Sequence, residues 1–158
     1  MNQSVCELEQ FVLGKLHLDF RPPPAREMRV TQVRCNFDYG VGTHKTDANR
    51  YRLTLRFDCH EAADDKTEVG NAVKAEISGF FRFPEGTEKK QMEALIRVNG
   101  VSILYGILRG IVANSTGVFP NGKFLLPTIM PQDIVKQVEA EKAAASKKNK
   151  PTKHTAKK

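Results

Sequence analysis

The sequence predicts an α+β fold in which four antiparallel strands come first and helices, packed on one face of the sheet, follow. Apolar and polar residues alternate through most of the chain up to Phe83, as they do in strands with one buried face. Helical spacing of apolar residues takes over after Thr87, and no helical pattern separates the strand-like segments. Strands that follow one another without crossover helices favour an antiparallel sheet.

Four segments should form the strands, namely residues 11–20, 27–38, 51–60 and 71–83. The third segment gives the clearest signal, because its apolar residues alternate strictly with charged and polar ones. In the first segment the alternation changes phase at Gly14, and in the second it changes near Thr31 and Gln32. A change of phase within a strand predicts a β-bulge at each point. Residues 39–49 and 61–70 should form loops.

Helices should span residues 87–98, residues 101–116 and a last segment that begins at Pro131. Thr87 is the candidate cap of the first helix, and Pro131 suits the first position of the last one. Residues 117–131 cannot continue a helix, because glycines and prolines interrupt them repeatedly. The apolar side chains of this loop either close the core or line an apolar groove; they are Val118, Phe119, Phe124, Leu125, Leu126, Ile129 and Met130.

The helix at residues 101–116 is apolar on two faces, and a helix of this kind must be covered on two sides. One face can rest on the sheet of its own chain. Because a glycine inside a helix costs about 1 kcal/mol relative to alanine, the two glycines one turn apart on the other face indicate close packing against a second helix. We therefore expect an oligomer interface formed by Ile103, Gly106, Ile107 and Gly110.

No transmembrane segment is expected, because a spanning helix needs about 20 mostly apolar residues. Arg109, Asn114 and Ser115 fall within that length here. The first ten residues lack the basic start and apolar run of a signal peptide, so we expect a cytoplasmic protein. Without an export signal, an odd number of cysteines makes a disulfide framework improbable, so the three cysteines are expected to be reduced thiols.

The net charge of +7 is concentrated in residues 147–158, which hold six lysines and no acidic residue; the rest of the chain carries only +1. The body is therefore nearly neutral, and no aromatic residues are interleaved with the lysines to stack on bases, so no specific nucleic-acid partner is expected. With 158 residues the chain should form a single domain. We expect a flexible arm at residues 1–9, the domain at 10–141 and a disordered, lysine-rich tail at 142–158.

The sequence offers no candidate for catalysis or for metal or cofactor binding. Its four histidines are not spaced from cysteines or carboxylates as metal ligands would be. Cys59 and His60 are adjacent in a predicted strand, so their side chains should point to opposite faces of the sheet. There is neither a nucleophile elbow nor a dinucleotide fingerprint. We therefore expect a protein that acts by contact rather than as an enzyme, with no cofactor and no metal.

An ordered set of motifs accompanies the apolar helix with its Arg109. A Glu85-Gly86-Thr87 turn comes before the first helix, and Thr116-Gly117-Val118-Phe119-Pro120, Leu125-Leu126-Pro127 and Asp133 follow the second. In this order the motifs, together with the succession of strands, resemble the SecB-like protein-export chaperones over about residues 8 to 138. The resemblance implies a four-stranded antiparallel sheet and a homotetramer built as a dimer of dimers.

The resemblance also implies an ATP-independent holdase, which binds unfolded polypeptides or preproteins in apolar grooves and serves protein export. Carried onto this chain, the groove residues are Phe20, Phe80, Phe119, Phe124, Leu126, Ile129 and Met130. Two alternatives remain: a SecB-like chaperone dedicated to an antitoxin or another specific client, and a basic RNA-binding module.

The motor ATPase SecA is the partner that the resemblance implies for the outer face of the sheet. Typical members of the family are acidic there, whereas the outward residues of this chain are mixed to basic; they are Lys15, His17, Arg34, Arg52, Arg56 and Lys74. The lysine-rich tail departs from the family in the same direction.

Overall fold

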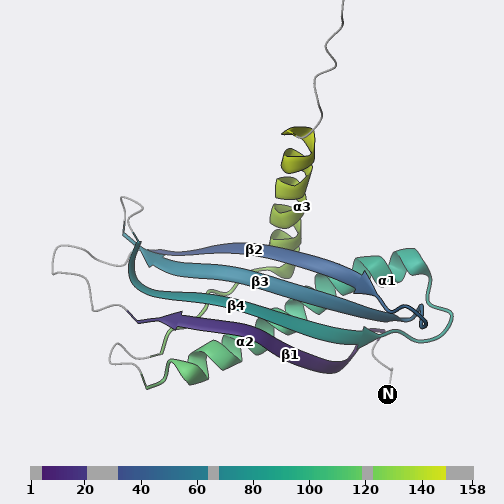
Figure 1. Ribbon diagram of the computed structural model, residues 1–158, viewed down its shortest axis with the longest axis horizontal. Coiled ribbons are helices and arrows are strands. Elements are labelled where there is room, and N and C mark those ends of the chain that lie inside the picture. Colours follow the sequence, from purple (N-terminus) through teal and green to yellow (C-terminus); the bar gives the residue numbers. More distant parts are fainter. Residues whose placement is uncertain (1–4, 21–31, 64–67, 119–122, 149–158) are drawn as a thin grey trace, which may run out of the picture.

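A four-stranded antiparallel sheet forms one layer of the computed structural model, which describes residues 5–20, 32–63, 68–118 and 123–148. The strands are β1 (Glu7–Asp19), β2 (Gln32–Thr43), β3 (Arg50–Ala62) and β4 (Glu68–Arg82). Their order across the sheet is β1-β4-β3-β2, which leaves β1 and β2 at the two edges (Figure 1).

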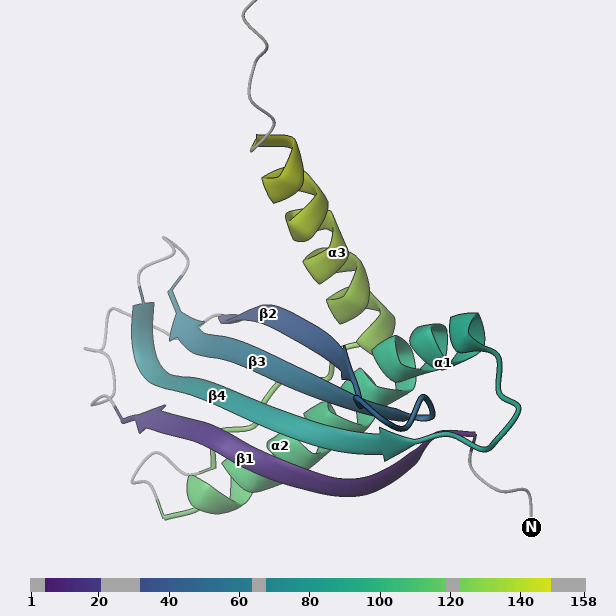
Figure 2. The same ribbon diagram turned by 45° about the vertical axis from the view of Figure 1, so that its right-hand side comes forward.

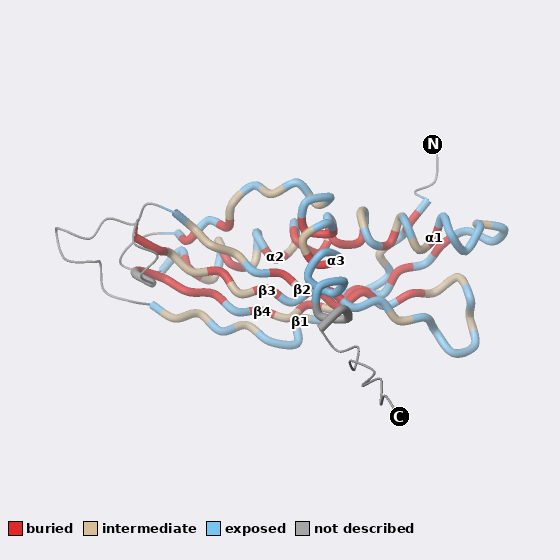
Figure 3. Tube along the Cα trace, turned by 90° about the horizontal axis from the view of Figure 1, so that it is seen from above, coloured by how far each residue is buried: buried red, intermediate tan, exposed pale blue. Residues whose placement is uncertain are grey.

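Helices form the second layer and cover one face of the sheet (Figure 3). This layer holds α1 (Lys89–Leu95), the π-helical turn η1 (Ile96–Gly100) and α2 (Val101–Ser115), which follow one another without a break. The last helix, α3 (Pro131–Lys148), begins at the predicted proline and rises past the edge of the sheet next to β2 (Figure 2). The predicted fold class, α+β with helices on one face, is confirmed.

The core lies between the sheet and α2, and it is built from residues at alternate positions of β3 and β4. Leu53, Leu55 and Ile77 are fully buried there, as are Leu104 and Leu108 of α2. Burying a side chain of this size contributes roughly 1.5–3 kcal/mol. The helix comes close to β4 at Gly79, where a Cβ atom would lie 2.8 Å from Leu104 Cδ2. A side chain at this position would therefore displace the Leu104 side chain.

The predicted bulge at Gly14 is confirmed, because the pairing of β1 with β4 shifts register between Leu13 and Lys15. A second shift, between Leu8 and Gln10, was not predicted. The bulge predicted near Thr31 and Gln32 lies at the limit of the described residues, since β2 begins at Gln32.

The loop predicted for residues 39–49 begins too early, because β2 continues to Thr43. Gly40 and Gly42 resemble turn residues in the sequence, yet they pair with Thr54 and Arg52 of β3. Pairing with a neighbouring strand outweighs the weak strand propensity of glycine at these edge positions.

The break predicted between the first two helices is absent, and one helix runs from Lys89 to Ser115. Gly100 packs against the sheet within η1, where a Cβ atom would lie 2.8 Å from Leu53 Cδ2. Thr87 does not cap the helix: Glu88 occupies the cap position, and the Thr87 hydroxyl donates to the Pro84 carbonyl at 2.8 Å. This helix is long and apolar enough to cross a membrane by length and composition alone, but one side of it packs on the sheet.

Cys35 and Cys59 form a disulfide, so the prediction of reduced thiols is wrong for this pair. The register of β2 and β3 places the two cysteines directly opposite each other, with their Cα atoms 4.1 Å apart. That juxtaposition depends on the pairing of two strands, which cysteine spacing alone does not reveal. Cys6 is a buried thiol, and burial raises its pKa to about 11.

Both ends of the described chain are more regular than predicted. Strand β1 begins at Glu7, inside the predicted arm, and Glu9 is held there by Arg50 at 3.1 Å. Helix α3 runs to Lys148, past the predicted domain end at residue 141, because its alanine-rich sequence has high helix propensity. Residues 1–4 and 149–158 lie outside the described residues.

Candidate functional site

The segment of residues 123–130, here called the connecting segment, is tied to the end of α2 by one buried threonine. The Thr116 side chain is almost completely buried. Its hydroxyl donates to the Val112 carbonyl at 2.7 Å and accepts the Phe124 backbone N–H at 2.9 Å. The hydroxyl thus satisfies a backbone donor that would otherwise be buried without a partner.

Two side chains one turn apart on α2 hold the rest of the connecting segment. The Tyr105 hydroxyl donates to the Pro127 carbonyl at 2.7 Å. The Arg109 guanidinium donates to the Leu126 carbonyl at 3.2 Å and to the Thr128 hydroxyl at 3.3 Å. Burial raises the pKa of Tyr105 to about 12, so the phenol stays a neutral donor at physiological pH. An irregular segment is in this way fixed along a helix.

Side chains of the connecting segment alternate between the core and the surface. Phe124 and Leu126 are buried, at 4% and 2% exposure. Leu125 and Met130 are 65% and 63% exposed, and Ile129 is half-buried. The segment therefore closes the core with one set of apolar side chains and presents a second set to the outside.

The outward side of α2 is smooth and open. Gly106 and Gly110 are exposed, and a Cβ atom at either position would meet no atom within 4 Å. Ile103 and Ile107 flank them and are half-buried against the core. A second helix could approach this surface closely at the two glycines, because neither carries a side chain.

Helix α3 is fastened to the edge strand β2 by polar contacts. The Tyr39 hydroxyl donates to Glu139 Oε1 at 3.2 Å, and Arg97 Nη1 donates to the same oxygen at 3.3 Å. The Lys142 ammonium lies 3.1 Å from Asp38 Oδ1 and 4.7 Å from the centre of the Tyr39 ring. Burial, followed by the Glu139 carboxylate, raises the pKa of Tyr39 to about 12. These contacts set the direction of α3.

The outer face of the sheet carries ion pairs that cross its strands. Arg56 bridges Asp38 at 3.3 Å and Glu76 at 2.7 Å, and the hydrogen bond that Arg56 donates to the Glu76 carboxylate raises the pKa of Arg56. Lys74 pairs with Asp58 at 2.9 Å. Two of the outward cations seen in the sequence are therefore compensated, and this face is mixed in charge. Within the described residues, no three His, Cys, Asp or Glu side chains gather as a metal site would require.

Comparison with known proteins gives a match in structure but not in sequence. No family model and no curated protein matches the chain. A SecB-like chaperone of Mycobacterium tuberculosis, solved with a ChAD peptide from the HigA1 antitoxin, superposes with a TM-score of 0.62 at 13% identity. The match covers 78% of this chain and 90% of that chaperone. The chain has the SecB-like fold.

A second solved structure, a protein of unknown function from Streptococcus agalactiae, matches with a TM-score of 0.46 at 16% identity. It covers 78% of this chain and 97% of the other. The resemblance to SecB-like proteins noted in the sequence is confirmed for the fold by the match to the Mycobacterium tuberculosis chaperone, over 78% of the chain.

The groove residues implied by the resemblance occupy different environments in the described part of the chain. Phe124 and Leu126 belong to the core, whereas Met130 is exposed beside them on the connecting segment. Phe20 is 37% exposed just beyond the end of β1, and Phe119 lies outside the described residues. The predicted set is therefore divided between core and surface.

Phe80 lies on the opposite side of the sheet from the connecting segment. It is 37% exposed and pairs with Arg52 of β3, whereas its neighbour Phe81 faces the core and is fully buried. Adjacent residues of a strand point to opposite faces, so alternation along β4 already contained this signal.

Two exposed apolar residues near the end of α2 and in the connecting segment are missing from the groove residues predicted from the sequence. Leu125 is 65% exposed, and Val118, just after α2, is 87% exposed. Both had been recognised as part of an apolar loop. The place of Leu125 follows from alternation within the connecting segment, in which Phe124 and Leu126 take the buried positions.

Proposed function

We propose that this protein is an ATP-independent holdase chaperone that binds extended segments of unfolded polypeptides. The observation that carries this proposal is the connecting segment, which is held rigidly by Thr116, Tyr105 and Arg109 yet keeps Leu125 and Met130 in solvent. Exposed apolar side chains on a fixed backbone are typical of surfaces that bind other proteins. The SecB-like fold supports the same function by analogy of fold.

Binding of this kind requires no nucleotide, because the free energy comes from removing apolar side chains from water. Each fully buried leucine or methionine contributes about 1.5–3 kcal/mol. A micromolar complex needs about 8 kcal/mol beyond the cost of association. One connecting segment is therefore too small a surface, and tight capture calls for several segments acting on one client chain.

Assembly supplies the additional segments. We propose a homotetramer, a dimer of dimers, in which α2 packs against α2 of another copy through Ile103, Gly106, Ile107 and Gly110. The exposed glycines support this arrangement, because no residue that the structure describes covers them. An assembly with the connecting segments on its outside would present several copies of Leu125 and Met130 to one client.

The clients that we propose are unfolded preproteins in the cytoplasm, held for protein export. SecA is a weaker proposal, because the outer face combines Asp38, Asp58 and Glu76 with cations rather than forming an acidic surface. A chaperone dedicated to an antitoxin is the second candidate, favoured by the antitoxin peptide in the structural neighbour from Mycobacterium tuberculosis. Broad capture of denatured proteins would distinguish the first candidate from the second.

The decisive experiment compares the double variant Leu125→Ser/Met130→Ser with the native chain. Capture of a reduced, denatured polypeptide is measured by native mass spectrometry and by suppression of its aggregation. The proposal predicts weaker capture with an unchanged oligomer, because both side chains point out of the core. Val41→Ser, at another exposed apolar position, is the matched control and should capture normally. Equal capture by the double variant and the control would refute the assigned surface.

An RNA-binding module would behave differently. Its affinity would fall steeply with salt and would persist after deletion of residues 147–158. Binding that disappears with those lysines would instead be a nonspecific property of the tail.

A further inference from the structure

A hollow of about 730 Å³ lies on the outer face of the sheet, opposite the helices, and the proposed function does not use it. We call it the end hollow. It lies between β1, β4 and β3 and the turn that joins β2 to β3, and its lining residues include Glu9, Gln10, His44, Lys45, Arg50, Arg52 and Phe80.

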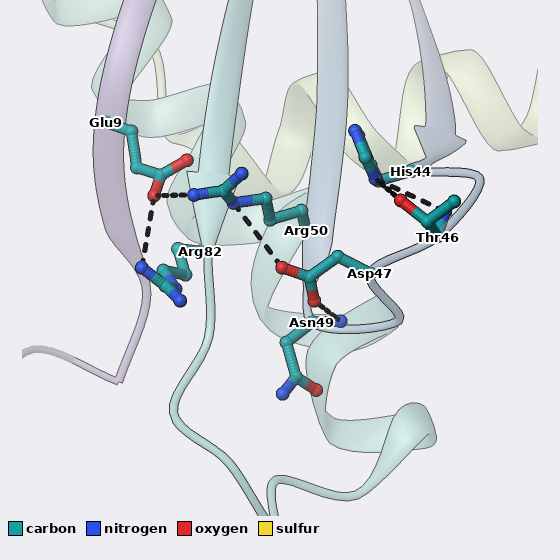
Figure 4. A network of polar contacts seen from close by, with 7 residues as sticks. All are labelled: Glu9, His44, Thr46, Asp47, Asn49, Arg50 and Arg82. Carbon is teal, nitrogen blue, oxygen red and sulfur yellow. Dashed lines mark hydrogen bonds and ion pairs between the residues drawn. The ribbon is translucent and has the colours of Figure 1, made fainter.

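A network of ion pairs fixes one side of the end hollow (Figure 4). Glu9 Oε1 lies 3.1 Å from Arg50 Nη2 and 3.7 Å from Arg82 Nη1. Arg50 Nε lies 3.5 Å from Asp47 Oδ2, and Asp47 Oδ1 accepts the Asn49 backbone N–H at 3.0 Å. The two arginines and the two carboxylates compensate one another. Glu9 and Arg50 line the hollow, and the compensated network adds little net charge to it.

The turn above this network is also held in place. The His44 ring nitrogen Nδ1 lies 3.3 Å from both the backbone nitrogen and the hydroxyl of Thr46 (Figure 4). Lys45, between them, therefore extends from a turn with a defined conformation. This turn and the ion-pair network are thus held in place before any partner binds, which lowers the entropic cost of binding.

Two cations of the end hollow are left without compensation. Lys45 and Arg52 have no ion-pair partner within the part of the chain that the structure describes. Phe80 pairs with Arg52 across the strands and exposes 37% of its surface on this otherwise polar face. The hollow thus combines an aromatic surface with two available positive charges.

We propose that the end hollow binds an acidic peptide segment of a partner protein, with one apolar side chain of that segment resting on Phe80. The carboxylates of the segment would pair with Lys45 and Arg52, and the guanidinium of Arg52 can bind a carboxylate through two parallel hydrogen bonds. This site goes beyond the holdase function and is separate from it. It lies on the face of the sheet opposite the connecting segment, so that a client and the acidic partner could bind at the same time.

A nucleic acid fits the same hollow less well. Binding of a single strand uses several aromatic residues, on which successive bases stack along a positively charged groove. Here one phenylalanine is available, and Glu9 lines the hollow and would repel phosphates. Two uncompensated cations suit a peptide that carries a few carboxylates.

The test is a titration of the full chain with a short labelled peptide that contains several Asp and Glu residues around one phenylalanine, followed by fluorescence anisotropy. Phe80→Ser should weaken binding about tenfold, because the apolar contact is lost. Arg52→Gln should weaken it about twofold to fivefold, as expected for a partly exposed ion pair. Arg34→Gln removes a cation from the same face at the far end of β2 and should leave the affinity unchanged.

Two further peptides identify the chemistry. The same peptide with Gln in place of its acidic residues, and one with Ala in place of its phenylalanine, should both bind more weakly. The Phe80→Ser and Arg52→Gln variants should capture a denatured polypeptide as well as the native chain does. This result would show that the peptide site is separate from the surface that serves the holdase function. Equal binding by all variants would overturn the proposal, and so would tighter binding of a single-stranded RNA that responds to the same substitutions.

Discussion

Replacing Thr116 by valine removes the hydroxyl that joins the end of α2 to the connecting segment, while the shape of the side chain is nearly preserved. The Phe124 N–H, which now donates to this hydroxyl at 2.9 Å, would be left in the core without a partner. An unsatisfied buried donor costs about 1–3 kcal/mol. We therefore expect Thr116→Val to lower the free energy of unfolding by that amount, which corresponds to a loss of about 2–12 °C in Tm for a chain of this size.

Urea unfolding at one fixed protomer concentration measures this effect, since association would otherwise change the apparent stability. Thr116→Ser is the matched control, because it keeps the hydroxyl and loses only a methyl group. Hydrogen exchange at the Phe124 amide should become faster in the valine variant than in the serine variant. A valine variant as stable as the native chain, with unchanged exchange, would show that this hydrogen bond does not anchor the connecting segment.

Three further predictions concern other parts of the chain. Tyr105→Phe should cost about 1 kcal/mol through the lost hydrogen bond to Pro127. Because the pKa of Tyr105 is raised to about 12 in the folded state, the native phenol should stabilise the fold fully below about pH 10 and lose that contribution toward pH 12. The free energies of unfolding of the native chain and the Tyr105→Phe variant, measured at increasing pH, should therefore converge over this range. Gly106→Leu should reduce the oligomer to a smaller species in native mass spectrometry, because the leucine would keep the second helix away. If this surface of α2 were instead exposed in the assembly, the oligomer would stay unchanged and the helix would be stabilised, since leucine has a higher helix propensity than glycine. Alkylation under denaturing conditions should label one cysteine per chain without reductant and three cysteines with it. Reducing the Cys35–Cys59 disulfide should lower the free energy of unfolding by about 3 kcal/mol. Three labelled cysteines without reductant would contradict the disulfide.

Alternation predicted the parts of the fold in which one face of a strand is buried. Leu53, Leu55 and Ile77 occupy the positions that period two assigns to the core, and the change of phase at Gly14 became a shift of register. Pro131 marked the start of α3 because a proline at the first helical position loses no hydrogen bond. The local sequence pattern is sufficient to predict a strand or helix wherever its buried residues repeat with the period of that element.

Features that depend on distant partners could not be obtained in this way. Gly40 is part of β2 because β3 supplies a partner for it, and the cysteine pair depends on the register between the same two strands. Gly100 lies inside the helix rather than at its end, and it packs against Leu53, where a Cβ atom would lie 2.8 Å from Leu53 Cδ2. Each of these features follows from contacts between segments far apart in the sequence, which single-sequence patterns do not encode.

The candidate site was predictable in kind but not residue by residue. The sequence indicates the apolar loop after α2 but does not decide between a role in the core and a role in a groove. The structure assigns Phe124 to the core and Met130 to the surface. Phe80 was grouped with them by resemblance alone, although its strand phase is opposite to that of Phe81. For this residue the periodicity of the strand was the better guide.

The most direct test of the holdase proposal is the native mass of the protein, recorded alone and after mixing with a reduced, denatured polypeptide. The account predicts a tetramer that takes up the unfolded chain without ATP, and a Leu125→Ser/Met130→Ser variant that remains a tetramer but takes up little. A monomer that ignores the denatured polypeptide would contradict both the proposed α2 interface and the proposed client surface, and would leave a SecB-like fold with another function.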